Sequence, residues 1–234
     1  MPSQFAQLSN KAIYTRLVFA RHGQTENNTE GKIADYSDEG LDEKGIEQMQ
    51  KTAKIILQDY FPDVVFSSTL PRAIQSAQII TKGTHIPFFT SDDLLEFNFG
   101  AIAGLTLLQV REKFPDLFES YVAWVDAENQ QTLQHPIIPD GEDKAAINTR
   151  IKKFTDMILA EYRGKNIVVI SHGAFIKCCL HYYAGGDMHR SNPYWVDNAS
   201  ISVVDFYKNT TMIRLVNDIH HLGISLKFGH PTIL

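Results

Sequence analysis

The chain has 234 residues, a length that suits one α/β domain and allows a sizeable core. Its 44% hydrophobic and 21% charged residues are those of an ordinary globular protein, and a formal net charge of −5 argues against nucleic acid or an anionic membrane as partner. No apolar stretch is long enough for a membrane span, and residues 1–11 lack the pattern of a secretory signal. The two cysteines, Cys178 and Cys179, are adjacent and cannot link distant segments, so we expect reduced thiols and a cytoplasmic protein.

The first part of the chain alternates short apolar runs with helical patterns. A polar loop over residues 24–41 ends at Asp42, a residue type that caps helices, and Pro62 closes the helical pattern that follows. Pro71 lies where the first turn of another helix is expected. The predicted elements are a strand at 17–20, a helix at 43–60, a strand at 63–67, a helix at 71–80 and a strand at 87–89.

The second part begins with a looser pattern over residues 91–139. Within it, residues 97–139 are predicted to form a small helical cap-like insertion in a single domain that spans 1–234. Asp140 is the expected N-cap of the helix that follows. The predicted elements are helices at 107–113 and 116–128, a helix after Asp140 whose apolar face runs from Ile147 to Ile158, a strand at 167–170, and a β-hairpin formed by 201–206 and 212–216.

Alternating strands and helices predict a three-layer α/β/α fold with a mostly parallel central sheet. Two of the apolar strands run directly into a histidine and a glycine, at His22-Gly23 and at His172-Gly173. The carboxyl ends of parallel strands form the ligand crevice of such sheets. If these two strands are neighbours, His22 and His172 lie together in that crevice.

The residues near these strand ends suit phosphoryl transfer. Neutral imidazole is a competent nucleophile near pH 7, which makes His22 a candidate. Arg21 and Arg72 can each grip two phosphate oxygens, and a helix that opens at Gly173 offers backbone N–H donors. The required acid is assigned to Glu96, whose aromatic neighbours predict an apolar setting that keeps the carboxyl protonated.

Five segments in order make the chain resemble the histidine phosphatase superfamily, which has the phosphoglycerate mutase-like fold, in the branch that carries its acid after the third strand. The resemblance covers residues 15 to about 220. The matching segments are Arg21-His22-Gly23-Gln24-Thr25-Glu26-Asn27-Asn28, Ser67-Ser68-Thr69-Leu70-Pro71-Arg72-Ala73, Glu96-Phe97-Asn98-Phe99-Gly100 with Gly104, Pro139-Asp140-Gly141-Glu142, and Ser171-His172-Gly173.

The resemblance implies a metal-independent phosphomonoester hydrolase that forms a phosphohistidine on His22. Glu96 would protonate the leaving group and then activate water. No metal or organic cofactor is implied, and the expected partner is a small phosphorylated metabolite, with a phosphoprotein left open and no nucleic acid or membrane. The residues implied to bind the phosphate are Arg21, Thr25, Asn28, Arg72, His172 and Gly173.

Other functions are left open by the residues. Mutases of this family usually carry a polar pair after the second His-Gly, whereas Ala174 and Phe175 are apolar here, so hydrolysis is favoured over phosphoglycerate mutase-type transfer. A non-catalytic phosphate- or phosphoprotein-binding module would not need Glu96. A metal-dependent hydrolase is a further alternative, although His220, His221 and His230 lack partners at ligand spacing.

The sequence leaves the substrate and the oligomeric state open. Asp92, Asp93 and Glu142 are neighbouring carboxyls that compete with Glu96 for the role of acid. The acidic run over residues 35–43 is expected to be a solvated loop and helix start. If it borders the pocket instead, it disfavours highly anionic substrates.

Overall fold

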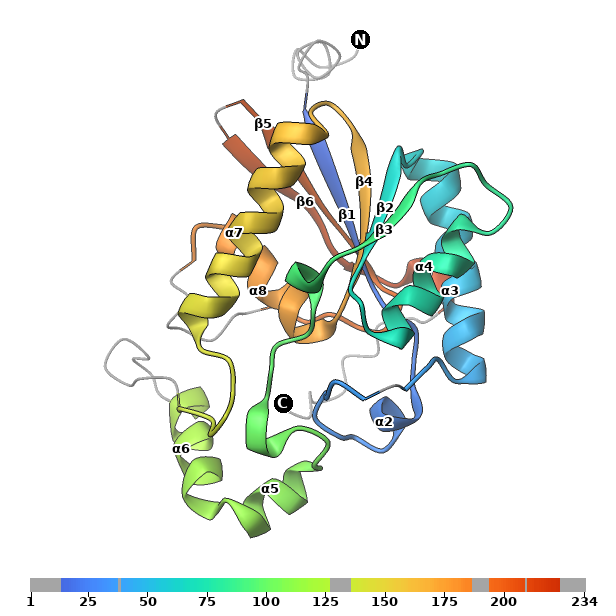
Figure 1. Ribbon diagram of the computed structural model, residues 1–234. Coiled ribbons are helices and arrows are strands. Elements are labelled where there is room, and N and C mark those ends of the chain that lie inside the picture. Colours follow the sequence, from blue (N-terminus) through green and yellow to red (C-terminus); the bar gives the residue numbers. More distant parts are fainter. Residues whose placement is uncertain (1–13, 38, 127–135, 187–193, 209, 224–234) are drawn as a thin grey trace.

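The computed structural model describes residues 14–37, 39–126, 136–186, 194–208 and 210–223 (Figure 1). Its centre is a six-stranded sheet in the order β3-β2-β4-β1-β5-β6. The strands β3, β2, β4 and β1 run parallel to one another, whereas β5 is antiparallel to both β1 and β6. The predicted mostly parallel sheet is therefore confirmed. The strands are β1 (Thr15–Arg21), β2 (Val64–Ser67), β3 (Phe88–Thr90), β4 (Asn166–Ser171), β5 (Ile201–Tyr207) and β6 (Thr210–Asp218).

Helices cover both faces of this sheet. Figure 1 shows α7 (Lys144–Glu161) and α8 (Gly173–Tyr183) on one side, and α3 (Glu43–Ile55) and α4 (Pro71–Thr81) on the other. Because side chains alternate along a strand, successive residues of β1 enter opposite layers. Phe19 packs in the core formed with α7 and α8, and Val18 packs in the core formed with α3 and α4. The three-layer α/β/α prediction is confirmed.

Helix ends are set by the residues that cap them. The Asp42 side chain accepts a hydrogen bond from the Gly45 amide at 2.6 Å, which confirms it as the N-cap of α3. This helix continues as a π-helical turn, η1 (Ile56–Tyr60), and ends at Phe61, whose φ is 45°. Pro71 occupies the first turn of α4, as predicted.

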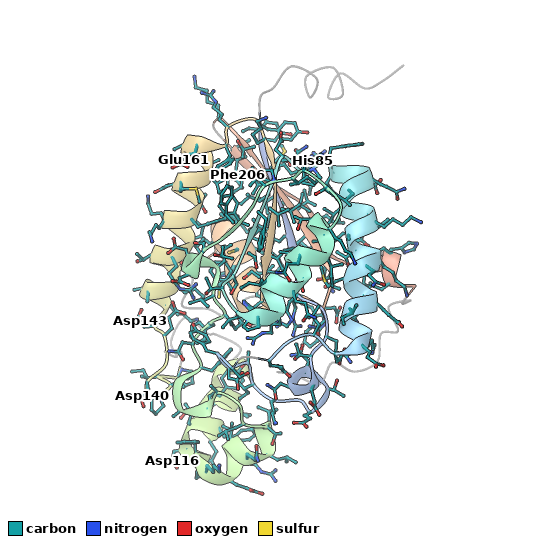
Figure 2. The ribbon with its side chains drawn as sticks, turned by 45° about the vertical axis from the view of Figure 1, so that its right-hand side comes forward. His85, Asp116, Asp140, Asp143, Glu161 and Phe206 are labelled. Carbon is teal, nitrogen blue, oxygen red and sulfur yellow. The ribbon has the colours of Figure 1, made fainter. Side chains whose placement is uncertain are left out.

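The predicted N-cap of α7, Asp140, lies three residues before the true N-cap. Asp143, not Asp140, is the N-cap, and its carboxylate accepts from the Ala146 amide at 2.6 Å. Asp140 has a φ of 58° and lies in a turn that the Gly141 amide closes onto the Ile138 carbonyl, whereas an N-cap needs extended backbone. Figure 2 shows Asp140 in the loop below the helix and Asp143 at its start.

The chain between β3 and α7 forms two short helices, α5 (Leu107–Lys113) and α6 (Pro115–Asp126). In Figure 1 they lie with α2 (Glu26–Thr29) beyond the carboxyl ends of the parallel strands. The short helix α2 falls inside the segment that was expected to be loop. The 3₁₀ turns are η2 (Asp92–Leu94), η3 (Gly100–Ile102) and η4 (His220–Leu222). Across the described ranges, no helix has both the length and the apolar character needed to cross a bilayer.

Candidate active site

Two adjacent parallel strands bring the two histidines together. β1 and β4 pair in register from Arg16 with Asn166 to Arg21 with Ser171, so each strand ends one residue before its histidine. The ring centroids of His22 and His172 are 5.1 Å apart, and both residues are at most 3% exposed. The predicted juxtaposition of the two histidines is confirmed.

Hydrogen bonding fixes which nitrogen of His22 is available. Its Nδ1 lies 2.7 Å from the carbonyl oxygen of Gly23. Because a carbonyl only accepts, Nδ1 carries the proton, and in the neutral ring Nε2 carries the lone pair. The backbone here is held by close approach to α3: a Cβ on Gly23 would lie 2.4 Å from the Gly45 carbonyl oxygen. The free lone pair of the neutral His22 ring is therefore on Nε2.

His172 is bound through the opposite nitrogen. Its Nε2 lies 2.8 Å from the hydroxyl of Ser68, while Nδ1 is buried with no hydrogen-bond partner in the described part of the chain. When the hydroxyl donates to Nε2, the proton of the neutral ring resides on Nδ1. His172 then carries an unused N–H donor beside His22.

The two arginines also keep free donors. Arg21 donates through Nη1 to the Val196 carbonyl at 2.9 Å, and Arg72 donates through Nη2 to the Asp35 carbonyl at 2.7 Å. In the described residues the buried atoms Nε of Arg21 and Nη1 of Arg72 have no partner. A Cβ on Gly173 would lie 3.3 Å from the Arg21 guanidinium, so glycine here leaves the start of α8 close to that cation. Buried donors without acceptors are costly, and an anion would satisfy them.

Electrostatics keep both imidazoles neutral. The pKa of His22 is lowered well below its ordinary value because burial disfavours the charged form, and because Arg21 and Arg72 repel a positive ring. Burial likewise lowers the pKa of His172, with further repulsion from His22 and the arginines. A neutral His22 is the form that can attack phosphorus.

Glu96 joins these groups from the loop after η2. The residue is 4% exposed, and its Oε1 accepts hydrogen bonds from the amides of Phe97 at 2.8 Å and Phe175 at 2.9 Å. Its Oε2 accepts from the amide of Ala174 at 3.2 Å. The start of α8 therefore holds the carboxyl next to His172. The aromatic residues next to Glu96 in the sequence predicted an apolar setting, but three main-chain amides donate hydrogen bonds to its carboxyl, so the setting is polar.

The competing carboxyls are engaged elsewhere. Glu142 forms two hydrogen bonds of 2.7 Å with Arg150, a residue that the sequence did not single out. The same guanidinium donates to the carbonyls of Asp93 and Leu95 and lies over the Phe175 ring, so it braces the loop that carries Glu96. Asp93 pairs with Lys153 at 3.0 Å, and Asp92 accepts from Thr69.

A second missed residue, Asn198, organises the loop after β1. Its Nδ2 lies within hydrogen-bond distance of the carbonyls of His22 and Gly23 and donates to Oδ1 of Asn28 at 2.9 Å. Because Oδ1 of Asn28 is engaged, its amide Nδ2 remains as the donor that a phosphate would use. Thr25 is fully buried and accepts from the Asn28 amide, which makes it the N-cap of α2.

These elements enclose a pocket of about 260 Å³, including the space open to solvent. Its lining residues are Arg21, His22, Thr25, Asn27, Asn28, Ala34, Asp35, Glu39, Arg72 and Glu96. The acidic run thus borders the pocket through Asp35 and Glu39, contrary to the expectation of a purely solvated loop.

The histidines of the C-terminal region form no metal site in the described residues, where no group of three or more His, Cys, Asp or Glu side chains could hold an ion. His220 is exposed, whereas His221 is half-buried, with Nε2 at 2.9 Å from the Thr52 hydroxyl. His221 therefore packs against α3 through Thr52. His230 lies outside the described residues.

The chain is similar in sequence to a known protein family and to phosphatases. A family model described as "Histidine phosphatase superfamily (branch 1)" matches residues 17–219. Phosphoserine phosphatase 1 from Hydrogenobacter thermophilus is 26% identical over 218 residues, which cover 93% of this chain and 99% of that protein. A metal-independent phosphoserine phosphatase from Arabidopsis thaliana is 28% identical over 210 residues, 89% of this chain and 84% of its own length.

A solved structure shares the fold. The phosphoserine phosphatase of Entamoeba histolytica, in complex with 3-phosphoglyceric acid, superposes with a TM-score of 0.74 at 23% identity. The match covers 89% of this chain and 99% of that one. The six-stranded sheet and its helical layers are therefore those of a known phosphatase fold.

Proposed function

This chain belongs to the histidine phosphatase superfamily and is a phosphomonoester hydrolase, and we propose that it works without a metal through a phosphohistidine on His22. One observation carries the proposal. The lone pair on Nε2 of His22 is surrounded by buried donors without partners, on Arg21, Arg72 and His172. A transferring phosphoryl group needs this combination of one nucleophile and several donors to its equatorial oxygens.

In the first half of the reaction, Nε2 of His22 attacks phosphorus and the bond from phosphorus to the ester oxygen breaks. Arg21, Arg72 and the Nδ1–H of His172 stabilise the charge on the phosphoryl oxygens, and the amide of Asn28 adds a further donor. The Glu96 carboxyl gives its proton to the departing oxygen, so the product leaves as an alcohol.

In the second half, the Glu96 carboxylate takes a proton from a water molecule as that water attacks phosphorus. The bond from phosphorus to Nε2 breaks, and its electron pair returns to the ring of His22. Inorganic phosphate leaves, with His22 neutral and Glu96 protonated again. The same carboxyl acts as acid and then as base, as microscopic reversibility requires.

We propose a small phosphorylated metabolite as the substrate. The pocket is lined by the nucleophile candidate, both arginines and Glu96 within one small cluster, which favours a compact ester over a folded phosphoprotein. The names of the relatives, which act on phosphoserine, support the same size class.

We also propose that residues 1–234 form one domain with a cap-like insertion near 97–139, and that the protein works in the cytoplasm. Cys178 and Cys179 are free, which is compatible with a reducing compartment.

The test is phosphate release from a panel of small phosphomonoesters in the presence of a chelator, with the wild type compared with His22→Ala. We expect release from the wild type in chelator and its loss in the variant, with both proteins folded by circular dichroism. Release that requires added metal would contradict a metal-independent reaction. Release that survives His22→Ala would contradict the phosphohistidine.

A further inference from the structure

The pocket has an acidic side that the phosphoryl chemistry does not use. Asp35 and Glu39 both line it, on the loop between α2 and α3, together with the two arginines and Glu96. Only the arginines among these lining residues carry positive charge. Arg72 is 3% exposed and keeps one buried nitrogen without a partner in the described residues, so the acidic side lies in the same pocket as the donors proposed for the phosphate.

Hydrogen bonds hold this loop against the catalytic groups. The main-chain carbonyl of Asp35 accepts from Arg72 at 2.7 Å, and the hydroxyl of Tyr36 donates to the main-chain carbonyl of Glu96 at 2.7 Å. Glu39 accepts from the Asn27 amide at 2.6 Å, which ties the loop to α2. The loop that carries Asp35 and Glu39 is therefore held at the pocket by hydrogen bonds to Arg72, Glu96 and Asn27.

Arg72 attracts both carboxylates electrostatically and Lys32 attracts Glu39, but neither cation makes an ion pair with them. Within the described residues, neither Asp35 nor Glu39 forms an ion pair; the nearby Lys32 pairs with Glu30. Asp35 accepts hydrogen bonds from the amide and hydroxyl of Ser37, which leave its negative charge in place. Once the negative charge of a bound phosphate offsets the two arginines, the rest of the substrate faces the negative charge of Asp35 and Glu39.

We propose that Asp35 and Glu39 select phosphomonoesters that carry an ammonium group a few bonds from the phosphate, and that they reject esters with a second anionic group. This inference rests on the proposed phosphatase function. A cation there gains Coulomb attraction in a partly buried site, whereas a second carboxylate or phosphate is repelled.

Three esters of nearly equal size test the inference: 2-aminoethyl phosphate, 2-hydroxyethyl phosphate and carboxymethyl phosphate. For the wild type we expect kcat/KM to decrease in that order. In the double variant Asp35→Asn with Glu39→Gln, which keeps the acceptor atoms, the preference for the aminoethyl over the hydroxyethyl ester should fall about tenfold. The control Glu161→Gln removes one exposed negative charge at the C-terminal end of α7, outside the pocket lining, and should leave that preference unchanged.

Added salt provides a second measurement on the wild type alone, should the double variant fail to fold. Screening by salt should reduce the preference for the ammonium ester. Equal kcat/KM for the three esters in the wild type, or a preference that neither the variant nor salt changes, would overturn the inference.

Failure of the proposed function has a different signature, because then none of the three esters is hydrolysed. In that case calorimetric titration of the same esters decides the inference: binding in the same order, weakened for the aminoethyl ester in the double variant, supports it. Binding without that order overturns it.

Discussion

The two strand ends that carry the histidines have the same backbone arrangement, but their imidazole rings are hydrogen-bonded through different nitrogens. His22 follows β1 and His172 follows β4. The two strands pair in register, and the two imidazole rings lie side by side at their carboxyl ends. His22 is hydrogen-bonded through Nδ1 to a carbonyl, which leaves the lone pair on Nε2 free for the nucleophilic role proposed above. His172 is tied through Nε2 to the hydroxyl of Ser68, which leaves Nδ1 as a donor. Because the two histidines occupy equivalent positions in the fold, the ring nitrogen that is hydrogen-bonded to a neighbouring residue determines which nitrogen each histidine can offer to a ligand.

The largest effect should come from replacing each histidine by glutamine. His22→Gln removes the attacking nitrogen, so kcat should fall about ten-thousandfold. His172→Gln removes one donor to the phosphoryl group, and a loss of about a hundredfold to a thousandfold is expected. Steady-state kinetics with one good substrate measures both. Equal decreases in kcat in the two variants would contradict the assignment of His22 as nucleophile and His172 as hydrogen-bond donor.

A smaller effect is expected when the group that orients His172 is removed. Ser68→Ala leaves Nε2 of His172 without its partner, and kcat/KM should fall about tenfold. Ser120→Ala, which removes an exposed hydroxyl on α6, is the matched control. Nitrogen-15 chemical shifts should show His172 protonated on Nδ1 in the wild type and a mixture of tautomers in Ser68→Ala. Unchanged shifts would contradict this positioning role.

The smallest effect is on stability as a function of pH. The pKa values of His22 and His172 lie well below the ordinary value of about 6.5, which the unfolded chain retains. Below that pH the unfolded state binds protons that the folded state does not, so the free energy of unfolding decreases as pH falls. Urea unfolding at pH 7.5 and 5.5 should show a weaker pH dependence in the double variant His22→Gln with His172→Gln. An equal or steeper dependence would show that these rings are not held neutral.

Much of the site could be predicted because its signals are local. His22 and His172 each follow an apolar strand by one residue, and the C-terminal ends of parallel neighbours meet by topology. Asp42 precedes a helical pattern, and its cap is a contact with a residue three positions away. Such features depend on a few consecutive residues, and a sequence displays them directly.

The residues that were missed act across long sequence separations. Asn198 contacts Asn28 from 170 positions away, and Arg150 reaches the carbonyl of Leu95 from 55 positions away. No periodicity or motif marks these contacts before the chain is folded. The N-cap of α7 failed for a related reason: Asp140 and Asp143 both fit the capping pattern, and a turn closed by Gly141 decides between them. Likewise, the sequence of the acidic run over residues 35–43 predicts a solvated loop, because the hydrogen bonds of Asp35 with Arg72 and of Tyr36 with Glu96 form only in the folded chain.

The most direct measurement is the identity of the phosphorylated atom. A reactive aryl phosphate needs little help from an acid to lose its leaving group, so Glu96→Gln should accept the phosphoryl group and then fail to hydrolyse it. We predict that mass spectrometry of this variant, digested under alkaline conditions after brief exposure to the ester, finds phosphate on His22, at Nε2 by phosphorus NMR. Phosphate on His172 or any other residue, or turnover with no phosphoenzyme on rapid quenching, would contradict the assignment of His22 as the nucleophile.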